Sequence, residues 1–370
     1  MKLQTHSPVV LFENEMSKLR ESLSAALFVK ETLWLASDET TSVERFSTDD
    51  GGTFKHHKSF PLADLITLPA AGTEFDQEVD IEGIDFRDSH LWLIGSHSIK
   101  RKNVKSSDSG SDEKLIKKLA QTESDGNRFI LARIPLIENE SGEQELVKSA
   151  DGPTGQGLRA STLSNDTSSN ALTDAIRTAG GNGDSHLSPF LNIPGKDNGF
   201  DIEGLAVTAE KVFVGLRGPV VRGWAVVLEL SVDTSDSSHL TLNPIGPDDR
   251  PYKKHFLDLK GLGVRELCVH GEDLLVLAGP TMNLDGPTLI YRWKGAINSQ
   301  REDLVRADQL VRVQEIPFGV SEDHAEGITI VSGEEQPPQL FVVYDSPSAK
   351  RKKSTNGVKA DVFDLHQTPI

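Results

Sequence analysis

The sequence is poor in cysteine and lacks both a long apolar run and a recognisable targeting segment. Cys268 is the only cysteine among the 370 residues, so no intramolecular disulfide can form, which fits a reducing compartment. No stretch approaches 18 uninterrupted apolar residues, so we expect no membrane-spanning helix. The N-terminal residues also lack a basic segment followed by a long apolar run, which argues against a signal peptide. We therefore expect a cytoplasmic protein with no membrane partner.

Positive charge is also scarce. The chain carries 39 Lys and Arg against 56 Asp and Glu, which gives a formal net charge of −17. An acidic surface repels phosphate backbones, so we do not expect general binding of nucleic acid. The sequence contains no Walker loop, no nucleophile elbow, no HExxH motif and no cysteine cluster. These absences exclude the usual sequence signatures of nucleotide-binding loops, serine hydrolases and zinc proteases.

One phrase repeats along the chain: a polar turn often ending in Glu-Gly, an apolar strand, a tight turn and a second apolar strand. Five copies occupy residues 22–39, 80–98, 201–219, 264–280 and 324–347. Aligning these copies places the following residues in register: Ser24, Glu82, Glu203, Glu266 and Glu326. Each copy precedes a third strand-like run, and most are then followed by a fourth, more polar one.

Four antiparallel strands in each unit of about 60 residues are typical of a β-propeller. We predict one all-β propeller domain over residues 1–370, with five blades favoured and six as the alternative. The chain ends shortly after the run 360–365, so we expect the N-terminal run 8–14 to pair with it and close the last blade. A β-sandwich or two stacked sheet domains is the competing architecture. The lack of long helices between strands argues against a parallel α/β fold.

Two segments depart from the repeat. Residues 101–127 interrupt the second blade between its second and third strands, and DEKLIKKLAQ within them predicts a short amphipathic helix. This insertion is interpreted either as a lid over the mouth or as a disordered surface segment. Residues 137–199 are rich in Gly, Ser, Asn and Asp and double one repeat interval. We interpret them as an insertion containing one helix, with a degenerate blade as the alternative.

In a propeller blade, the turn that enters the first strand and the loop that leaves the second lie at the same face. This geometry gathers carboxylates around one channel mouth: Glu82, Asp201, Glu203, Glu266, Glu326 and Asp345. Two such charges ~8 Å apart repel by roughly 2 kcal/mol at an effective dielectric of ~20. Ca²⁺ or Mg²⁺ could offset this repulsion, since both prefer oxygen ligands. Alternatively, arginines offset it, or the Glu side chains bind backbone N–H groups of the neighbouring blade as staples.

Basic and polar residues are expected at the same mouth and predict an anionic ligand. We assign ligand contacts to Asp38, Ser96, Arg101 and Arg222. If the mouth is catalytic, Lys100 and Arg217 neutralise developing charge and His97 shuttles a proton. The competing interpretation is that the basic runs are solvated loops.

These motifs resemble an uncharacterised bacterial family, domain of unknown function 3616. The resemblance rests on residues 80–102, 128–136, 198–230, 324–331 and 342–351. A looser similarity to phytase-like and lactonase-like propellers implies Ca²⁺ in the channel mouth and ester hydrolysis.

Two functions follow as hypotheses. The first is a scaffold that binds a small anionic ligand or a protein partner at the mouth. The second is a hydrolase of phosphoesters or related esters, in which a bound cation lowers the pKa of a water molecule.

Overall fold

A computed structural model describes most of the chain. The residues described are 3, 7–13, 16–48, 52–72, 78–105, 107–124, 126–235, 238–282, 284–333 and 336–365. Within them the predicted all-β class is confirmed, because strands dominate and the three α-helices are short. None of the described helices is both long and apolar enough to cross a bilayer.

The first two sheets are built from residues of the N-terminal half together with later strands. The order in the first sheet is β2 (Leu23–Val29), β3 (Thr32–Ser37), β4 (Ser42–Thr48), β5 (Thr53–Pro61), β1 (Val9–Leu11), β29 (Gly357–Lys359) and β28 (Lys352–Lys353). The second sheet runs β6 (Ile81–Arg87), β7 (His90–Gly95), β10 (Leu131–Glu138), β14 (Ser161–Leu163), β19 (His239–Leu242) and β18 (Val232–Asp233), with β11 (Gln144–Leu146) beside β10.

Three further sheets of three to five strands follow in chain order, and β8 with β9 and β12 with β13 form two-stranded pairs described below. The third consists of β15 (Asp201–Val207), β16 (Val212–Val221), β17 (Trp224–Leu230), β20 (Lys253–Leu257) and β24 (Asp303–Val305). The fourth consists of β21 (Gly263–His270), β22 (Asp273–Gly279), β23 (Thr288–Trp293) and β25 (Leu310–Ile316). The fifth has β26 (His324–Gly333), β27 (Gln336–Asp345) and β30 (Asp361–Asp364).

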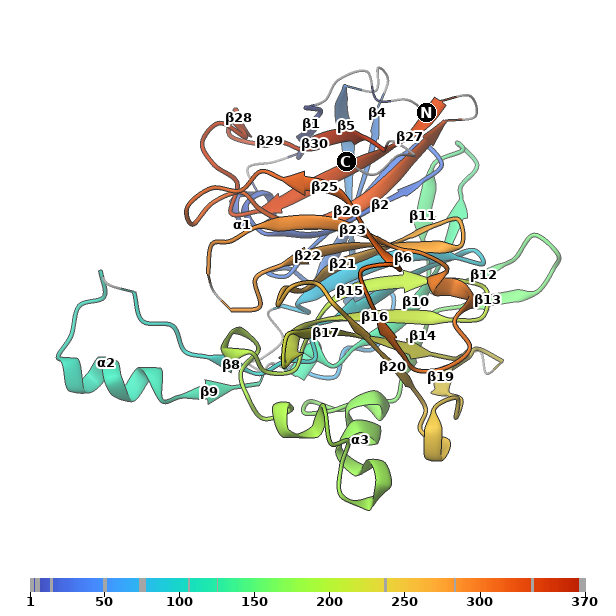
Figure 1. The fold of residues 1–370 in the computed structure, drawn as a ribbon. Coiled ribbons are helices and arrows are strands. Elements are labelled where there is room, and N and C mark those ends of the chain that lie inside the picture. The colour runs from blue at the N-terminus through green and yellow to red at the C-terminus, as the bar shows by residue number, and fades with distance from the viewer. Residues whose placement is uncertain are drawn as a thin grey trace.

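The first strand of each sheet, called the inner strand here, packs against the inner strands of the neighbouring sheets. β2 contacts β6, β6 contacts β15, β15 contacts β21, β21 contacts β26, and β26 contacts β2 (Figure 1). Apolar clusters fill the space between adjacent sheets. Trp34 and Leu93 share the cluster between the first and second sheets, and Leu33 and Phe341 share the one between the first and fifth. Burial of these apolar faces holds the sheets together.

The two segments that depart from the repeat contain helices. α2 (Asp112–Leu119) follows β8 (Lys100–Arg101), precedes β9 (Thr122–Glu123) and projects from the sheets (Figure 1). Residues 106 and 125 of the predicted insertion lie outside the described residues. Residues 137–199 contribute β14 to the second sheet, a hairpin of β12 (Ser149–Asp151) with β13 (Gly157–Arg159), and α3 (Ala171–Thr178). α3 packs Leu172 and Ile176 into the core between the second and third sheets.

The N-terminal strand does not pair as predicted. β1 lies between β5, to which it is parallel, and β29, to which it is antiparallel, so it extends the first sheet. Among the described residues β30 pairs with β27 alone. Within the predicted run 360–365, the Ala360 N–H donates a hydrogen bond of 3.0 Å to the Pro8 carbonyl, just before β1. The prediction was wrong by a few residues, because β1 pairs with β29, which ends at Lys359, and β30 pairs with β27 instead. Residue 14 of the predicted strand lies outside the described residues.

A β-bulge recurs near the start of every inner strand and corrects the predicted register. The bulge falls at Ser24, Glu82, Glu203 and Glu326, but in the fourth sheet it falls at Arg265. Arg265 is therefore the equivalent of the mouth carboxylates, and Glu266 occupies the position of the following glycines. Because side chains alternate between faces of a strand, this shift of one residue sends Glu266 away from the mouth.

Glu266 acts instead as a staple between adjacent inner strands. Its Oε1 atom accepts hydrogen bonds from the Leu205 N–H at 3.1 Å and from its neighbour Leu267 at 2.8 Å. Asp85 accepts from the Val207 N–H at 2.6 Å, and Thr329 accepts from the Phe28 N–H. The staple hypothesis is therefore confirmed for Glu266.

The glycines after the bulge allow the inner strands to approach closely. A Cβ atom on Gly83 would lie 2.6 Å from the Cβ atom of Leu205 in the next inner strand. Gly83 has no positive φ, so the lack of a side chain, rather than unusual backbone torsion, is what the site requires.

We predict that Glu266→Ala lowers the free energy of unfolding by about 3 kcal/mol, because two buried N–H groups lose their acceptor. Glu266→Gln keeps a carbonyl oxygen at the same place and should cost less than about 1 kcal/mol. Urea unfolding of both variants measures the difference. Equal losses in the two variants would show that the staple does not stabilise the fold.

Candidate functional site

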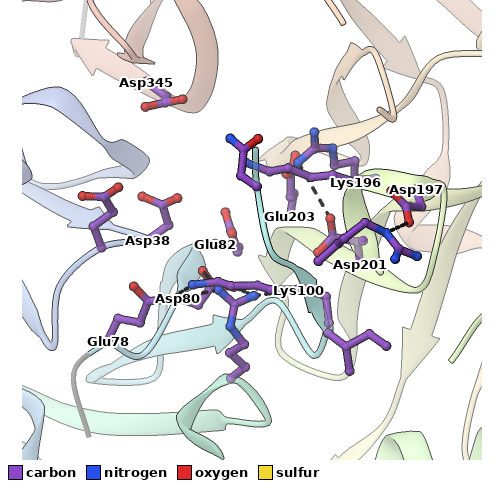
Figure 2. Close-up of a pocket in the computed structure, with 18 of the residues that line it drawn as sticks. Asp38, Glu78, Asp80, Glu82, Lys100, Lys196, Asp197, Asp201, Glu203 and Asp345 are labelled. Carbon is purple, nitrogen blue, oxygen red and sulfur yellow. Dashed lines mark hydrogen bonds and ion pairs between the residues drawn. The ribbon is translucent and has the colours of Figure 1, made fainter. Parts of the chain in front are cut away.

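A cavity of about 410 Å³ lies where the bulges and the ends of the second strands meet. Ten acidic and six basic side chains line it, so the wall is acidic (Figure 2). Nine of the twelve predicted site residues are among the lining residues: Asp38, Glu82, Lys100, Arg101, Asp201, Glu203, Arg217, Glu326 and Asp345. The starts of the inner strands, the loop after β3, the short strand β8, strand β16 and the end of β27 bring these residues together.

Three predicted residues do not line the cavity. His97 is 3 % exposed, and its ring contacts the Gly95 carbonyl and the side-chain amide of Asn170, next to α3. Burial lowers the pKa of His97 to about 4, so the ring is neutral near pH 7. The assignment of His97 as a proton shuttle at the mouth is therefore wrong. Ser96 is buried against Ser98 and Arg128, and Arg222 is exposed in the turn between β16 and β17.

One half of the mouth consists of paired charges. Glu203 is held by Arg217, with Nη1 to Oε1 at 2.7 Å, and by Arg265, with Nε to Oε2 at 2.9 Å. Arg265 also pairs with Glu326. Asp201 lies 3.7 Å from the Arg217 guanidinium. The two arginines therefore offset two of the three negative charges, and each guanidinium is already paired with carboxylates.

A third buried arginine, Arg128, holds the other side of the cavity. Its guanidinium contacts both carboxylate oxygens of Asp80, at 2.7 and 2.6 Å, and Glu78 at 3.0 Å. At the rim, Lys100 pairs with Glu78, and Arg101 contacts Asp197 at 2.7 Å. Three of the basic residues that the sequence suggested for anion recognition, Lys100, Arg101 and Arg217, are thus already engaged with carboxylates.

Three carboxylates cluster near Arg128, and this one guanidinium cannot balance their three negative charges. Asp38, Asp80 and Glu82 each place an oxygen within 4.8 Å of the others (Figure 2). Glu82 is 9 % exposed, and among the described residues its carboxylate has no hydrogen-bond or ion-pair partner. The Oδ1 atom of Asp38 is likewise buried without a described partner. Unpaired buried carboxylates are costly, which makes this cluster the uncompensated part of the mouth.

Burial and mutual repulsion shift the titration of these groups. Burial, reinforced by Asp80 and Glu203, raises the pKa of Glu82 well above its ordinary value. Burial also raises the pKa of Asp201 to about 7 and that of Glu326 to about 8, although their arginine partners oppose the shift. Burial would raise the pKa of Asp345 too, but hydrogen bonding with His324 and Ser346 outweighs it and lowers that pKa. The cavity therefore holds protons that a solvated carboxylate would release.

Sequence reasoning did not assign roles to Glu78, Asp80, Arg128, Lys196 or Asp197, which also line the cavity. Asp80 stands at the same place before β6 as Asp201 does at the start of β15, so the repeat offered a signal for it. Arg128 lies just before β10 and reaches the mouth from there. Lys196 and Asp197 belong to the segment 137–199, whose path over the mouth has no sequence signature.

A comparison with family models matches residues 22–361 to the family described as protein of unknown function, DUF3616. The match spans most of the chain. The chain belongs to this family. The predicted resemblance is therefore confirmed, whereas a search of curated proteins found no match.

Solved structures similar to this chain share little sequence with it. Glutaminyl cyclase from Myxococcus xanthus is 10 % identical, with a TM-score of 0.38, over 97 % of this chain and 100 % of its own. An exo-1,5-alpha-L-arabinanase from a bovine ruminal metagenomic library is 8 % identical, with a TM-score of 0.40, over 99 % and 96 % of the two chains. At this level of similarity neither structure carries an argument about function.

We predict that the metal-free protein loses stability between about pH 6 and pH 8. Asp201 and Glu326 titrate at about 7 and about 8 when folded, but near ~4 when unfolded. Between these values the folded state keeps protons that the unfolded state has lost. Their stabilising contribution is complete below the unfolded pKa and disappears as pH rises through the folded pKa.

Thermal melts of chelator-treated protein at constant ionic strength measure this loss. The melting temperature should fall by a few degrees, and Glu326→Gln should flatten the slope between about pH 7 and pH 8. A melting temperature that stays level or rises over this range would contradict the assignment.

Proposed function

We propose that the cavity binds a divalent cation, Ca²⁺ or Mg²⁺, and through it a small anionic ligand. The observation that carries this proposal is the Glu82 carboxylate, which is nine-tenths buried, lines the cavity and has no described partner. With Asp38 and Asp80 it forms a set of oxygen donors within 4.8 Å of one another. Hard divalent cations prefer such carboxylate oxygens.

The donor set fits a cation better than it fits a proton alone. Arg128 fixes the orientation of Asp80 by contacting both of its oxygens, and this pairing leaves Asp38 and Glu82 without a positive partner. A divalent ion would offset the repulsion that burial amplifies among the three groups. Asp38, Asp80 and Glu82 would hold the ion, which replaces the earlier assignment to Glu203, Glu326, Asp201 and Asp345. Those four carboxylates lie in the part of the cavity that has its own cations.

An anionic ligand fits the same cavity once a cation is bound. The lining carries more acidic than basic side chains, so an anion alone would meet repulsion. A divalent ion would supply the missing positive charge, as Lys196 also does from the opposite wall (Figure 2). We therefore propose binding of a small anion as the primary role, with the cation as an integral part of the site.

The proposal includes the fold that presents the site. We propose that the five sheets are the five blades of a closed propeller, with the inner strands around the channel. The contact between β26 and β2 and the shared apolar cluster of the first and fifth sheets support closure. Five blades also match the five bulges, one near the start of each inner strand.

The test is a calorimetric titration of Ca²⁺, then Mg²⁺, into chelator-treated protein. We predict a binding heat in the wild type and at least a tenfold loss of affinity in Glu82→Gln, because a charged ligand oxygen is lost. Glu266→Gln is the matched control, since this buried glutamate lies one residue past the bulge and does not line the cavity. Saturating cation at ~1,000 times its Kd should also stabilise the fold by about 4 kcal/mol.

Two results would contradict the proposed cation site. One is the absence of binding heat and of any thermal shift in the wild type. The other is equal affinity in the wild type and in Glu82→Gln.

Metal-assisted hydrolysis of a phosphoester or related ester is the second candidate. The observation that favours it is Asp201, which lines the cavity with a pKa near 7, a value suited to accepting a proton from an attacking water. The cation would supply electrophilic stabilisation of developing negative charge. Hydrolysis of p-nitrophenyl phosphate in the presence of Ca²⁺ or Mg²⁺ should then rise with pH through about 7. Asp201→Asn should reduce it at least 100-fold. Unchanged turnover in that variant would exclude Asp201 as the base.

A further inference from the structure

Large apolar side chains are exposed mainly around the mouth. Among the described residues, seven such side chains are exposed, and four of them belong to two neighbouring loops beside the cavity: Met282, Leu284, Phe318 and Val320. A fifth, Leu119, lies at the end of α2 and lines the main cavity. Scattered apolar residues need no explanation, but a group beside an acidic cavity indicates a binding surface.

A second, smaller pocket opens among these residues and continues into the main cavity. Met282, Leu284 and Phe318 line it on one side. It shares four residues with the main cavity: Lys196, Arg217, Glu326 and Asp345. Val320 stands on the same loop as Phe318 but does not line the pocket. One ligand can therefore lie across both compartments, with its apolar part next to the acidic wall.

Hydrogen bonds fix the two apolar loops in place. The Asp285 carboxylate accepts a hydrogen bond from the Ser321 N–H at 2.8 Å, which ties the loop after β22 to the loop before β26. The His324 ring extends this link to the main cavity. Its Nε2 atom lies 3.3 Å from the Asp285 carboxylate, and its Nδ1 atom lies 3.8 Å from the Asp345 carboxylate. The Arg217 Nε atom donates to the Thr281 carbonyl at 2.9 Å. The paired arginine of the mouth thus also positions the apolar side of the second pocket.

We propose that the second pocket binds the apolar part of the ligand, so that the ligand is a small amphipathic anion. This inference rests on the proposed cation site, which holds the anionic group. A phosphate or carboxylate attached to an alkyl or aromatic group has the required chemistry. The continuity of the two pockets and the charge of the main cavity together specify this occupant.

Paired probes that differ in their apolar part test the inference. Phenyl phosphate and methyl phosphate are titrated separately into Ca²⁺-saturated protein, after a Ca²⁺ titration of the same preparation. Burial of the phenyl group predicts that phenyl phosphate binds about tenfold more tightly than methyl phosphate. Phe318→Ser and Met282→Ser should each reduce this preference, while affinity for methyl phosphate and for Ca²⁺ stays unchanged.

Val320→Ser is the control, because it removes an exposed apolar side chain of the same loop as Phe318 that does not line the pocket. It should leave the preference for phenyl phosphate intact. Thermal melts of the three variants are the control that each variant is folded.

The outcomes separate the two proposals. Binding of Ca²⁺ and methyl phosphate with no preference for the phenyl group overturns the apolar pocket alone. A preference that survives in both Phe318→Ser and Met282→Ser also overturns it. Absence of both Ca²⁺ and Mg²⁺ binding overturns the cation site and, with it, this inference.

Discussion

Burying carboxylates is unfavourable unless positive charge or a proton offsets each one, and the mouth of this protein is organised by that constraint. Three buried arginines supply most of the compensation. Arg217 and Arg265 pair with Glu203, Glu326 and Asp201 and offset two of their three charges, and Arg128 pairs with Asp80. On the other side of the cavity, Glu82 has no hydrogen-bond or ion-pair partner among the described residues. The proposed cation site is the place where the chain's own cations are too few.

The recurring β-bulge explains why these charges meet at all. In four of the five inner strands it aims a charged side chain at the mouth and leaves the next residue facing the neighbouring strand. In the fourth sheet the aimed residue is Arg265, which places a cation among the carboxylates. The next residue, Glu266, then has no role at the mouth and instead satisfies backbone N–H groups between sheets. A change of one position in the repeat thus separates a charge partner from a structural staple.

The acidic cavity and the apolar loops form one connected surface. Arg217 contacts a mouth carboxylate through one nitrogen and the loop after β22 through another. The same residue therefore positions the charged wall and the apolar pocket. This connection is why the two proposals describe one ligand rather than two. A cation at Glu82 would hold the anionic group, and Phe318 and Met282 would contact the rest.

The sequence by itself determined the strands and the two insertion helices, because the periodicity of apolar residues is a local property. The spacing of the repeat also predicted that nine of the site residues lie in one cavity. The tertiary structure decided the rest. The pairing of β1 with β29, the partner of Arg128 and the burial of His97 depend on segments far apart in the chain. The register at Arg265 depends on a bulge that the residue pattern does not mark. Such contacts are selected by packing and charge compensation between sheets, and no stretch of sequence carries that information alone.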